Sequence, residues 1–199
     1  DLYREVGNVL ERCPDLKVIF AHFYFLSGDL ERASSLLENY RNVYLDITPG
    51  SEMYYDFSAK RDEWREFFIQ YQDRILYGTD INNGMTLERA VNHANRITIF
   101  LETDKPIIWG SYPTKDEPLI GLSLPEHVVK KIYAENFERI VGEKPRDINL
   151  EAAVKECERL AQVTVKLGGK KVKVPKWMRV EKRMKNPAEY VASLLKRMK

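Results

Sequence analysis

Short, mostly apolar runs recur along the first 142 residues, and each ends beside a polar residue. They occupy residues 16–21, 42–47 and 75–78. Apolar runs of this length are typical of parallel strands that are buried on both faces. The pattern therefore predicts three buried strands in this part of the chain.

Between and after these runs, apolar residues recur at intervals of three and four, which is the spacing of amphipathic helices. The predicted helices cover residues 1–12, 30–40, 59–71, 85–102 and 126–140. Asp29 and Ser58 precede the second and third of these and are expected to cap them. Residues 48–57 are predicted to form a loop after the second strand, and residues 104–123 a loop rich in Pro and Gly.

The order strand–helix, repeated three times, is that of βαβ units with right-handed crossovers. A complete barrel of this kind needs eight such units. The predicted fold is therefore α/β, either a small open sheet or the second part of a barrel.

The character of the sequence changes after residue 142. A further amphipathic helix is predicted over residues 147–162, and a last helix over 186–198. Between them, two alternating runs joined by Gly168-Gly169 predict a β-hairpin over residues 163–174. We therefore divide the chain into a body, residues 1–142, and a basic extension, residues 143–199.

Charge is distributed unevenly, although the net charge is only +2. Residues 163–199 carry 12 Lys and Arg against two Asp and Glu, whereas the rest of the chain carries 20 against 28. We favour a basic segment that docks on an acidic surface of the same body or of a neighbouring subunit. Nucleic-acid binding is the alternative, and it predicts binding that weakens steeply with salt.

No apolar run approaches the length of a membrane-spanning helix, so no membrane partner is expected. The two cysteines, Cys13 and Cys157, form neither a CxxC pair nor a zinc-binding spacing. This use of cysteine fits the reducing cytoplasm.

Two strands end in residues that could carry chemistry, His22 after the first and Asp80 after the third. The carboxyl ends of parallel strands lie at one edge, where α/β barrels carry their active sites. A His and an Asp there suggest a metal or acid–base site. A capping Asp and a core His with satisfied hydrogen bonds would give the same pattern, and the spacing does not decide between them.

Four pieces of sequence occur in an order that resembles a known family. They are Ala21-His22, the run from Asn42 to Asp46, Gly78-Thr79-Asp80, and Lys131-Ile132-Tyr133 followed by Asn136 and Arg139. In this order they resemble the amidohydrolase-related metal-dependent hydrolases, which are TIM barrels of the amidohydrolase superfamily. The resemblance covers about residues 1–142.

The resemblance implies a fold and a chemistry. The three strands would be the sixth, seventh and eighth of the barrel, and the fold the C-terminal portion of a (β/α)8 barrel. His22 would lie near the metal, as a ligand or acting on the substrate or the attacking water. Asp80 would bind a divalent metal, most simply zinc, and accept a proton from metal-bound water. Substrates would be small molecules carrying an amide, ester, lactone or carboxylate.

Aromatic residues on the segments beside this edge are candidates for substrate binding. Tyr24 and Tyr54 could line an aromatic pocket, although loop aromatics pack under lids equally often. Asp46 is interpreted as a residue that binds backbone amides of the following loop. Asn136 and Arg139 are interpreted as anchors of the closing helix rather than as substrate contacts.

The sequence also departs from the family. The family's first strand carries His-x-His and its fifth a further histidine, but the histidines here are His22, His93 and His127. His93 and His127 fall on helices and are expected to face solvent. A catalytic zinc takes three protein ligands, so the site is expected to be incomplete in this chain.

We therefore expect a C-terminal part of a longer hydrolase, whose exposed sheet edges pair with the missing N-terminal half-barrel or with another copy. The alternative is a non-catalytic α/β module that keeps the scaffold and has lost the His-x-His.

Overall fold

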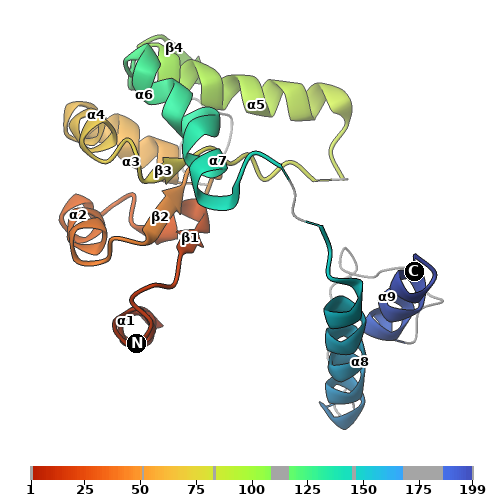
Figure 1. Ribbon diagram of the computed structural model, residues 1–199. Helices are drawn as coiled ribbons and strands as arrows, with labels where there is room; N and C mark the ends of the chain where they lie inside the picture. Colours follow the sequence, from red (N-terminus) through yellow and green to blue (C-terminus); the bar gives the residue numbers. More distant parts are fainter. Residues whose placement is uncertain are drawn as a thin grey trace. The chain divides into compact units, whose positions relative to one another are not determined.

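A computed structural model defines the fold (Figure 1). The structure describes residues 2–50, 52–82, 84–108, 117–144, 147–167 and 186–198. Contacts within the chain define two compact units, Asp1–Glu143 and Lys144–Lys199. Each unit has its own architecture.

The first unit is built on a parallel sheet of three strands in the order β1-β2-β3 (Figure 1). The strands are β1 (Val18–Phe20), β2 (Val43–Asp46) and β3 (Ile75–Leu76). Phe20 pairs with Leu45, and Asp46 pairs with Leu76, so β2 is the central strand. The α/β class and the order of the strands agree with the sequence prediction, and no closed barrel forms among the described residues.

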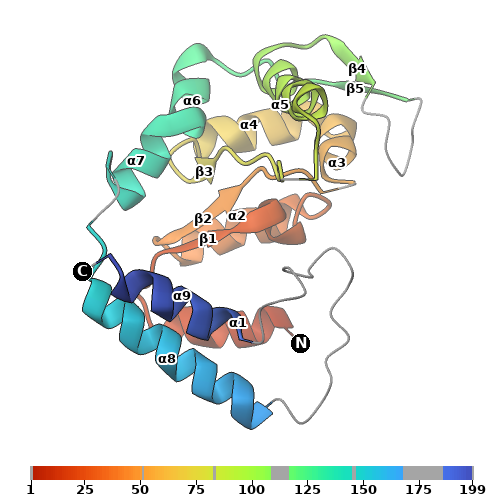
Figure 2. The same ribbon diagram turned by 90° about the vertical axis from the view of Figure 1, so that its right-hand side faces the viewer.

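One face of this sheet is covered by α2 (Leu30–Asn39) and α4 (Arg61–Gln70), which lie on the same side of it in both views (Figures 1 and 2). Side chains alternate along a strand, and Val43, Leu45 and Ile75 point into this core. Tyr44 and Leu76 alternate with them and are buried outside the main core cluster. Ile19, which pairs with Tyr44, is 37 % exposed. The second face is therefore less completely covered.

Polar groups at the amino ends of the strands hold α2 in place. Asp29 caps α2 as predicted, accepting a hydrogen bond from the backbone N of Arg32 at 3.0 Å. At the other end, the Arg74 guanidinium donates to the carbonyl oxygens of Leu37, Tyr40 and Val43. A cation at the C-terminus of a helix also complements its dipole. Partial burial lowers the pKa of Arg74 from its usual value.

The segment after β2 corrects two expectations. Residues 53–59 form a helix, α3 (Met53–Ala59), instead of a loop. Its buried residues Met53, Tyr54 and Phe57 have the spacing of one helix face, which stabilises the helix through packing despite its short length. Ser58 therefore lies inside α3, where its hydroxyl accepts from the backbone N of Ile120 at 2.7 Å instead of capping α4.

The last part of the first unit begins with α5 (Leu87–Glu102), which Thr86 caps. The predicted loop after it contains an antiparallel pair, β4 (Pro106–Ile108) with β5 (Pro118–Ile120). The following segment closes the end of α5: the backbone N of Leu122 donates to Phe100 O, and that of Leu124 to Leu101 O. Backbone amides thus satisfy carbonyls that a helix end leaves open.

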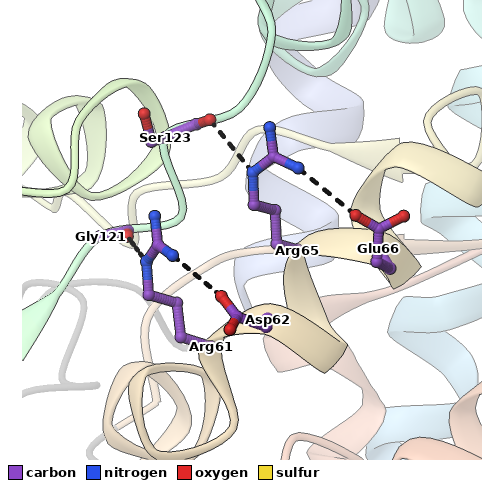
Figure 3. A network of polar contacts seen from close by, with 6 residues as sticks. All are labelled: Arg61, Asp62, Arg65, Glu66, Gly121 and Ser123. Atoms are coloured by element: carbon purple, nitrogen blue, oxygen red, sulfur yellow. Dashed lines mark hydrogen bonds and ion pairs between the residues drawn. The ribbon is translucent and has the colours of Figure 1, made fainter.

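Two arginines of α4 hold this closing segment from the other side (Figure 3). Arg61 Nε donates to Gly121 O at 2.7 Å, and Arg65 Nε to Ser123 O at 3.4 Å. Each guanidinium also pairs with the neighbouring carboxylate, Asp62 or Glu66 (Figure 3). These local ion pairs are solvent-facing on the acidic side and contribute little by themselves.

The closing helix runs continuously through α6 (Glu126–Lys130), η2 (Lys131–Glu135) and α7 (Asn136–Val141). In η2 the helix widens by one residue, so the backbone N of Asn136 donates to Lys131 O, five residues earlier. The carbonyl of Ile132 accepts from the backbone N of Tyr77 at 2.9 Å. The helix thereby extends the hydrogen bonding of the sheet beyond β3.

Asn136 anchors this helix, as expected. Its side chain is 1 % exposed, and Nδ2 donates to Gln72 O at 2.7 Å and to Ile75 O at 2.8 Å. Arg139 donates to Asn136 Oδ1 and to Asp73 O. The interpretation of both residues as structural anchors is confirmed by these contacts.

The second unit contains α8 (Leu150–Leu167) and α9 (Pro187–Lys196). Asn186 caps α9 through Oδ1 and donates to Ala161 O of α8. Residues 163–167 continue α8, so the prediction that they form the first strand of a hairpin is wrong; their alternation is compatible with the end of an amphipathic helix. The rest of the predicted hairpin lies outside the described residues. No helix within the described part of the chain is long and apolar enough to cross a membrane.

The Asn136 side chain is predicted to be a major source of stability in the first unit. Asn136→Ala should lower the free energy of unfolding by about 2–3 kcal/mol, because two buried carbonyls and one guanidinium contact lose their partner. Urea unfolding followed by circular dichroism measures this. Glu135→Ala, on the exposed side of the same helix, is the control and should change stability by less than about 0.5 kcal/mol. Equal effects would contradict the anchoring interpretation.

Two glycine substitutions should have opposite effects. A Cβ at Gly121 would lie 2.1 Å from Thr103 O and 2.7 Å from Phe100 O. Gly121→Ala should therefore destabilise the fold by about 3 kcal/mol or more. At Gly7, inside α1 (Leu2–Arg12), the nearest atom would be Tyr40 Oη at 3.6 Å. Gly7→Ala should raise stability by up to about 1 kcal/mol. Thermal midpoints of the two variants test the contrast, and a loss of similar size in both would refute it.

Candidate functional site

The carboxyl edge of the sheet brings together the ends of all three strands. His22 follows β1, Asp46 ends β2, and Asp80 lies four residues after β3. Thr48 connects these segments. Its carbonyl oxygen lies 3.2 Å from His22 Nδ1, and a Cβ at Gly78 would lie 2.1 Å from Thr48 Oγ1. The predicted site residues His22 and Asp80 thus belong to one edge.

His22 begins a turn, η1 (Ala21–Phe25), with an unusual backbone. His22, Phe23, Tyr24 and Phe25 have φ angles of 52°, 52°, 54° and 57°, all in the left-handed region. This region costs a non-glycine residue about 1–2 kcal/mol. Four such residues in succession require compensation from packing and hydrogen bonds.

Packing of Phe23 supplies one part of that compensation. Its side chain is fully buried and contacts an aromatic cluster at ring-centroid distances of 5.0 to 5.9 Å, formed by Phe57, Trp64, Phe67 and Phe68. These residues are in the core, as their spacing predicts. Each aromatic contact of this kind adds to the stability gained from burial.

Hydrogen bonds fix His22 itself. Its backbone N donates to Asp46 Oδ1 at 3.2 Å, and the same carboxylate oxygen accepts from the backbone N of Thr48 at 2.9 Å. This confirms that Asp46 binds backbone amides of the following loop. A carbonyl oxygen only accepts, so the contact of Nδ1 with Thr48 O places the ring proton on Nδ1. The lone pair of a neutral ring then lies on Nε2.

Asp80 differs from Asp46 in having an exposed side chain. Its φ of 53° is one that Asp tolerates better than most residues. The loop around it is closed locally: Thr79 Oγ1 accepts from the N of Ile81, and Asn82 Oδ1 from the N of Gly84. The described residues include no hydrogen-bond or ion-pair partner for the carboxylate of Asp80. This group is therefore available to solvent or a ligand.

The two candidate substrate contacts have different surroundings. Tyr24 is half-buried and stacks on Phe20 at 4.0 Å between ring centroids. Tyr54 is buried in α3, and its hydroxyl donates to Ile47 O at 2.8 Å. Burial raises the pKa of both phenols, and raises that of Tyr54 well above its usual value. A substrate-binding role for either residue remains a prediction.

A metal ion would find few protein ligands at this edge. His22 and Asp80 are its two candidate donors, and no group of three His, Cys, Asp or Glu side chains suited to a metal occurs in the described residues. His127 is exposed on α6, whereas His93 is half-buried in α5. The described residues therefore do not form a complete zinc site by themselves.

Residues 2–142 match the family model described as amidohydrolase. The chain belongs to the amidohydrolase family. The match covers nearly the whole first unit, including His22, Asp46 and Asp80. No curated protein and no solved structure gives a significant match to the chain. Members of the amidohydrolase family are generally metal-dependent, which contrasts with the two candidate donors described above.

A cavity of about 410 Å³ lies at the opposite edge of the sheet. It is lined by residues near the amino ends of β1 and β2, among them Cys13, Tyr40 and Asn42. In α/β barrels the chemistry lies at the carboxyl ends of the strands. This cavity is therefore separate from the edge that carries His22.

Sequence reasoning missed two residues that shape this edge. Thr48 was treated only as part of a strand-breaking Thr-Pro-Gly sequence, and the left-handed turn was treated as an ordinary loop. Neither Phe23 nor Tyr24 favours positive φ, so local sequence gave no signal for the turn. It becomes understandable only from the buried aromatic cluster that Phe23 enters.

The Tyr54 hydroxyl should contribute stability that depends on pH. Its pKa is raised in the folded state, so the unfolded chain releases the proton first, near the usual value of about 10. The contribution is therefore fully present below about pH 10 and is lost as the pH rises further. Tyr54→Phe should cost about 1 kcal/mol at neutral pH, and this deficit should shrink between about pH 9 and pH 11.

Urea unfolding at several pH values measures this change. Tyr40→Phe, at a half-buried tyrosine of the same unit, is the matched control. A Tyr54→Phe deficit that stays constant across the alkaline range would contradict the prediction.

Proposed function

We propose that this chain provides His22 and Asp80 to the site of a metal-dependent hydrolase that acts on a small molecule in the cytoplasm. The observation that carries the proposal is the state of His22 at the carboxyl edge of the sheet, with Nδ1 bound to Thr48 O. This leaves Nε2 as the atom that can accept a proton or bind a ligand. Family membership supports the reaction class.

The two residues suit different parts of such a reaction. His22 Nε2 can take a proton from an attacking water or, once protonated, donate one to a leaving group. Asp80 offers an exposed carboxylate with no structural partner among the described residues. Tyr24 would face the substrate side of the same edge. Substrates with an amide, ester, lactone or carboxylate group fit this chemistry.

The proposed cofactor is a divalent metal, most simply zinc. Because zinc takes three protein ligands, the donors beyond His22 and Asp80 would come from outside the described residues. We propose that the three strands correspond to the sixth to eighth of a barrel and associate with a missing half-barrel or a second copy. The partly exposed Ile19 on β1, whose only strand partner in the described sheet is β2, supports such an association.

A non-catalytic α/β module is the second candidate. The observation that favours it is the lack of a three-donor group among the described residues. Such a module would keep the sheet and its closing helix and would bind zinc no better than its surface residues allow.

Zinc binding by the purified chain distinguishes these candidates. Competition with a chromophoric chelator measures the affinity of the wild type, His22→Gln and Asp80→Asn. We expect each substitution to weaken binding by at least about tenfold, or about 1.4 kcal/mol, because each removes one of two ligands. His127→Gln, at an exposed histidine outside this edge, should leave the affinity unchanged.

Light scattering of the same samples shows whether one zinc is shared between two copies. Equal affinities in the wild type, His22→Gln and Asp80→Asn would contradict the proposal and support the non-catalytic module. The same conclusion would follow if the wild type bound no zinc.

A further inference from the structure

We propose that Asp46 is a positioning residue that fixes the His22 imidazole in the form protonated on Nδ1. This inference rests on the proposed role of His22 and extends it. It starts from one atom, Asp46 Oδ1, which accepts both from the backbone N of His22 at 3.2 Å and from the backbone N of Thr48 at 2.9 Å.

These two hydrogen bonds determine the position of the ring's own partner. Thr48 O, which accepts from His22 Nδ1, belongs to the residue whose backbone N is bound to Asp46. The main chain of the ring donor and that of its acceptor are therefore tied to the same carboxylate oxygen. Moving either segment away from Asp46 would lengthen the contact between Nδ1 and Thr48 O.

The arrangement opposes what an imidazole does in water. A free neutral histidine side chain prefers the proton on Nε2, whereas here the carbonyl of Thr48 requires it on Nδ1. A tautomer that runs against the solution preference needs a fixed acceptor. Asp46 can fix it because it ends the central strand, paired with Leu76 on one side and following the Leu45–Phe20 pair on the other.

The left-handed turn makes this restraint necessary. His22 is the first of four non-glycine residues with φ between 52° and 57°. Burial of Phe23 holds the second of them, but His22 is only partly buried and depends on its backbone hydrogen bond to Asp46. Without that bond the first residue of the turn can relax toward a less costly conformation.

The tautomer determines what His22 can do. With the proton on Nδ1, Nε2 presents a lone pair that accepts a proton or binds an electrophile. With the proton on Nε2, the same position would present a donor, and the ring could not act as a base there. Asp46 would thus act through His22 without touching the substrate.

Nuclear magnetic resonance can read this tautomer directly. Long-range ¹H–¹⁵N correlation spectra in mildly alkaline buffer distinguish protonated from unprotonated ring nitrogens. The chain has three histidines, and His93→Gln and His127→Gln assign the remaining signals to His22. We expect the wild type to carry the His22 proton predominantly on Nδ1.

Three variants test the role of Asp46. Asp46→Ala removes the acceptor and should shift the tautomer ratio toward Nε2 by at least about fivefold, the factor that corresponds to about 1 kcal/mol. Asp46→Asn keeps an oxygen acceptor for both amides and should retain the wild-type tautomer. Asp29→Ala, which removes another carboxylate that accepts from a backbone N, is the matched control and should also retain it.

A wild-type His22 protonated mainly on Nε2 would overturn the proposal, even if Asp46→Ala fails to fold. So would a folded Asp46→Ala variant with an unchanged tautomer. These outcomes are separate from the zinc experiment because the spectra need neither metal nor substrate. A fixed tautomer in a chain that binds no zinc would leave this inference standing and remove the proposed function.

Discussion

The ring of Phe23 links the edge that carries His22 to the hydrophobic core. Phe23 lies in a turn of four left-handed residues, and its side chain packs among aromatic residues of α3 and α4. The gain from burying a phenylalanine, about 1.5–3 kcal/mol before the aromatic contacts are added, is of the same order as the local strain. The geometry of His22 therefore depends on core packing some residues away from any ligand.

The two edges of the sheet use polar groups in different ways. At the amino ends of the strands, Arg74 and Asn136 are saturated with backbone carbonyls and have no capacity left for a ligand. At the carboxyl ends, Asp46 is occupied by two amides, whereas Asp80 and Nε2 of His22 retain free capacity within the described residues. This asymmetry is what parallel α/β folds need, because one edge must remain rigid while the other binds.

Much of this could be predicted from the sequence. Apolar runs and helical spacing identified the three parallel strands and most of the helices, and Asp29 was recognised as a cap. The helix over Met53–Ala59 was missed because Thr48-Pro49-Gly50 suggested a longer loop, and its stability comes from tertiary packing. The predicted strand at residues 163–167 failed because β-branched residues also occur in helices when one face is packed. The arrangement around His22 could not be predicted, since it depends on a carbonyl and an amide of Thr48, which any residue would supply.

The widened turn η2 has a consequence for insertions and deletions in this family of sequences. A regular helix through residues 126–141 would reach its end with one residue fewer, because the turn at Lys131–Glu135 takes five residues for one hydrogen bond. Each residue of an α-helix rotates the following face by about 100°. Deleting a single residue here would restore a regular helix and yet turn Asn136 away from the carbonyls of Gln72 and Ile75. The length of this segment is thus under stricter control than the identity of its exposed residues.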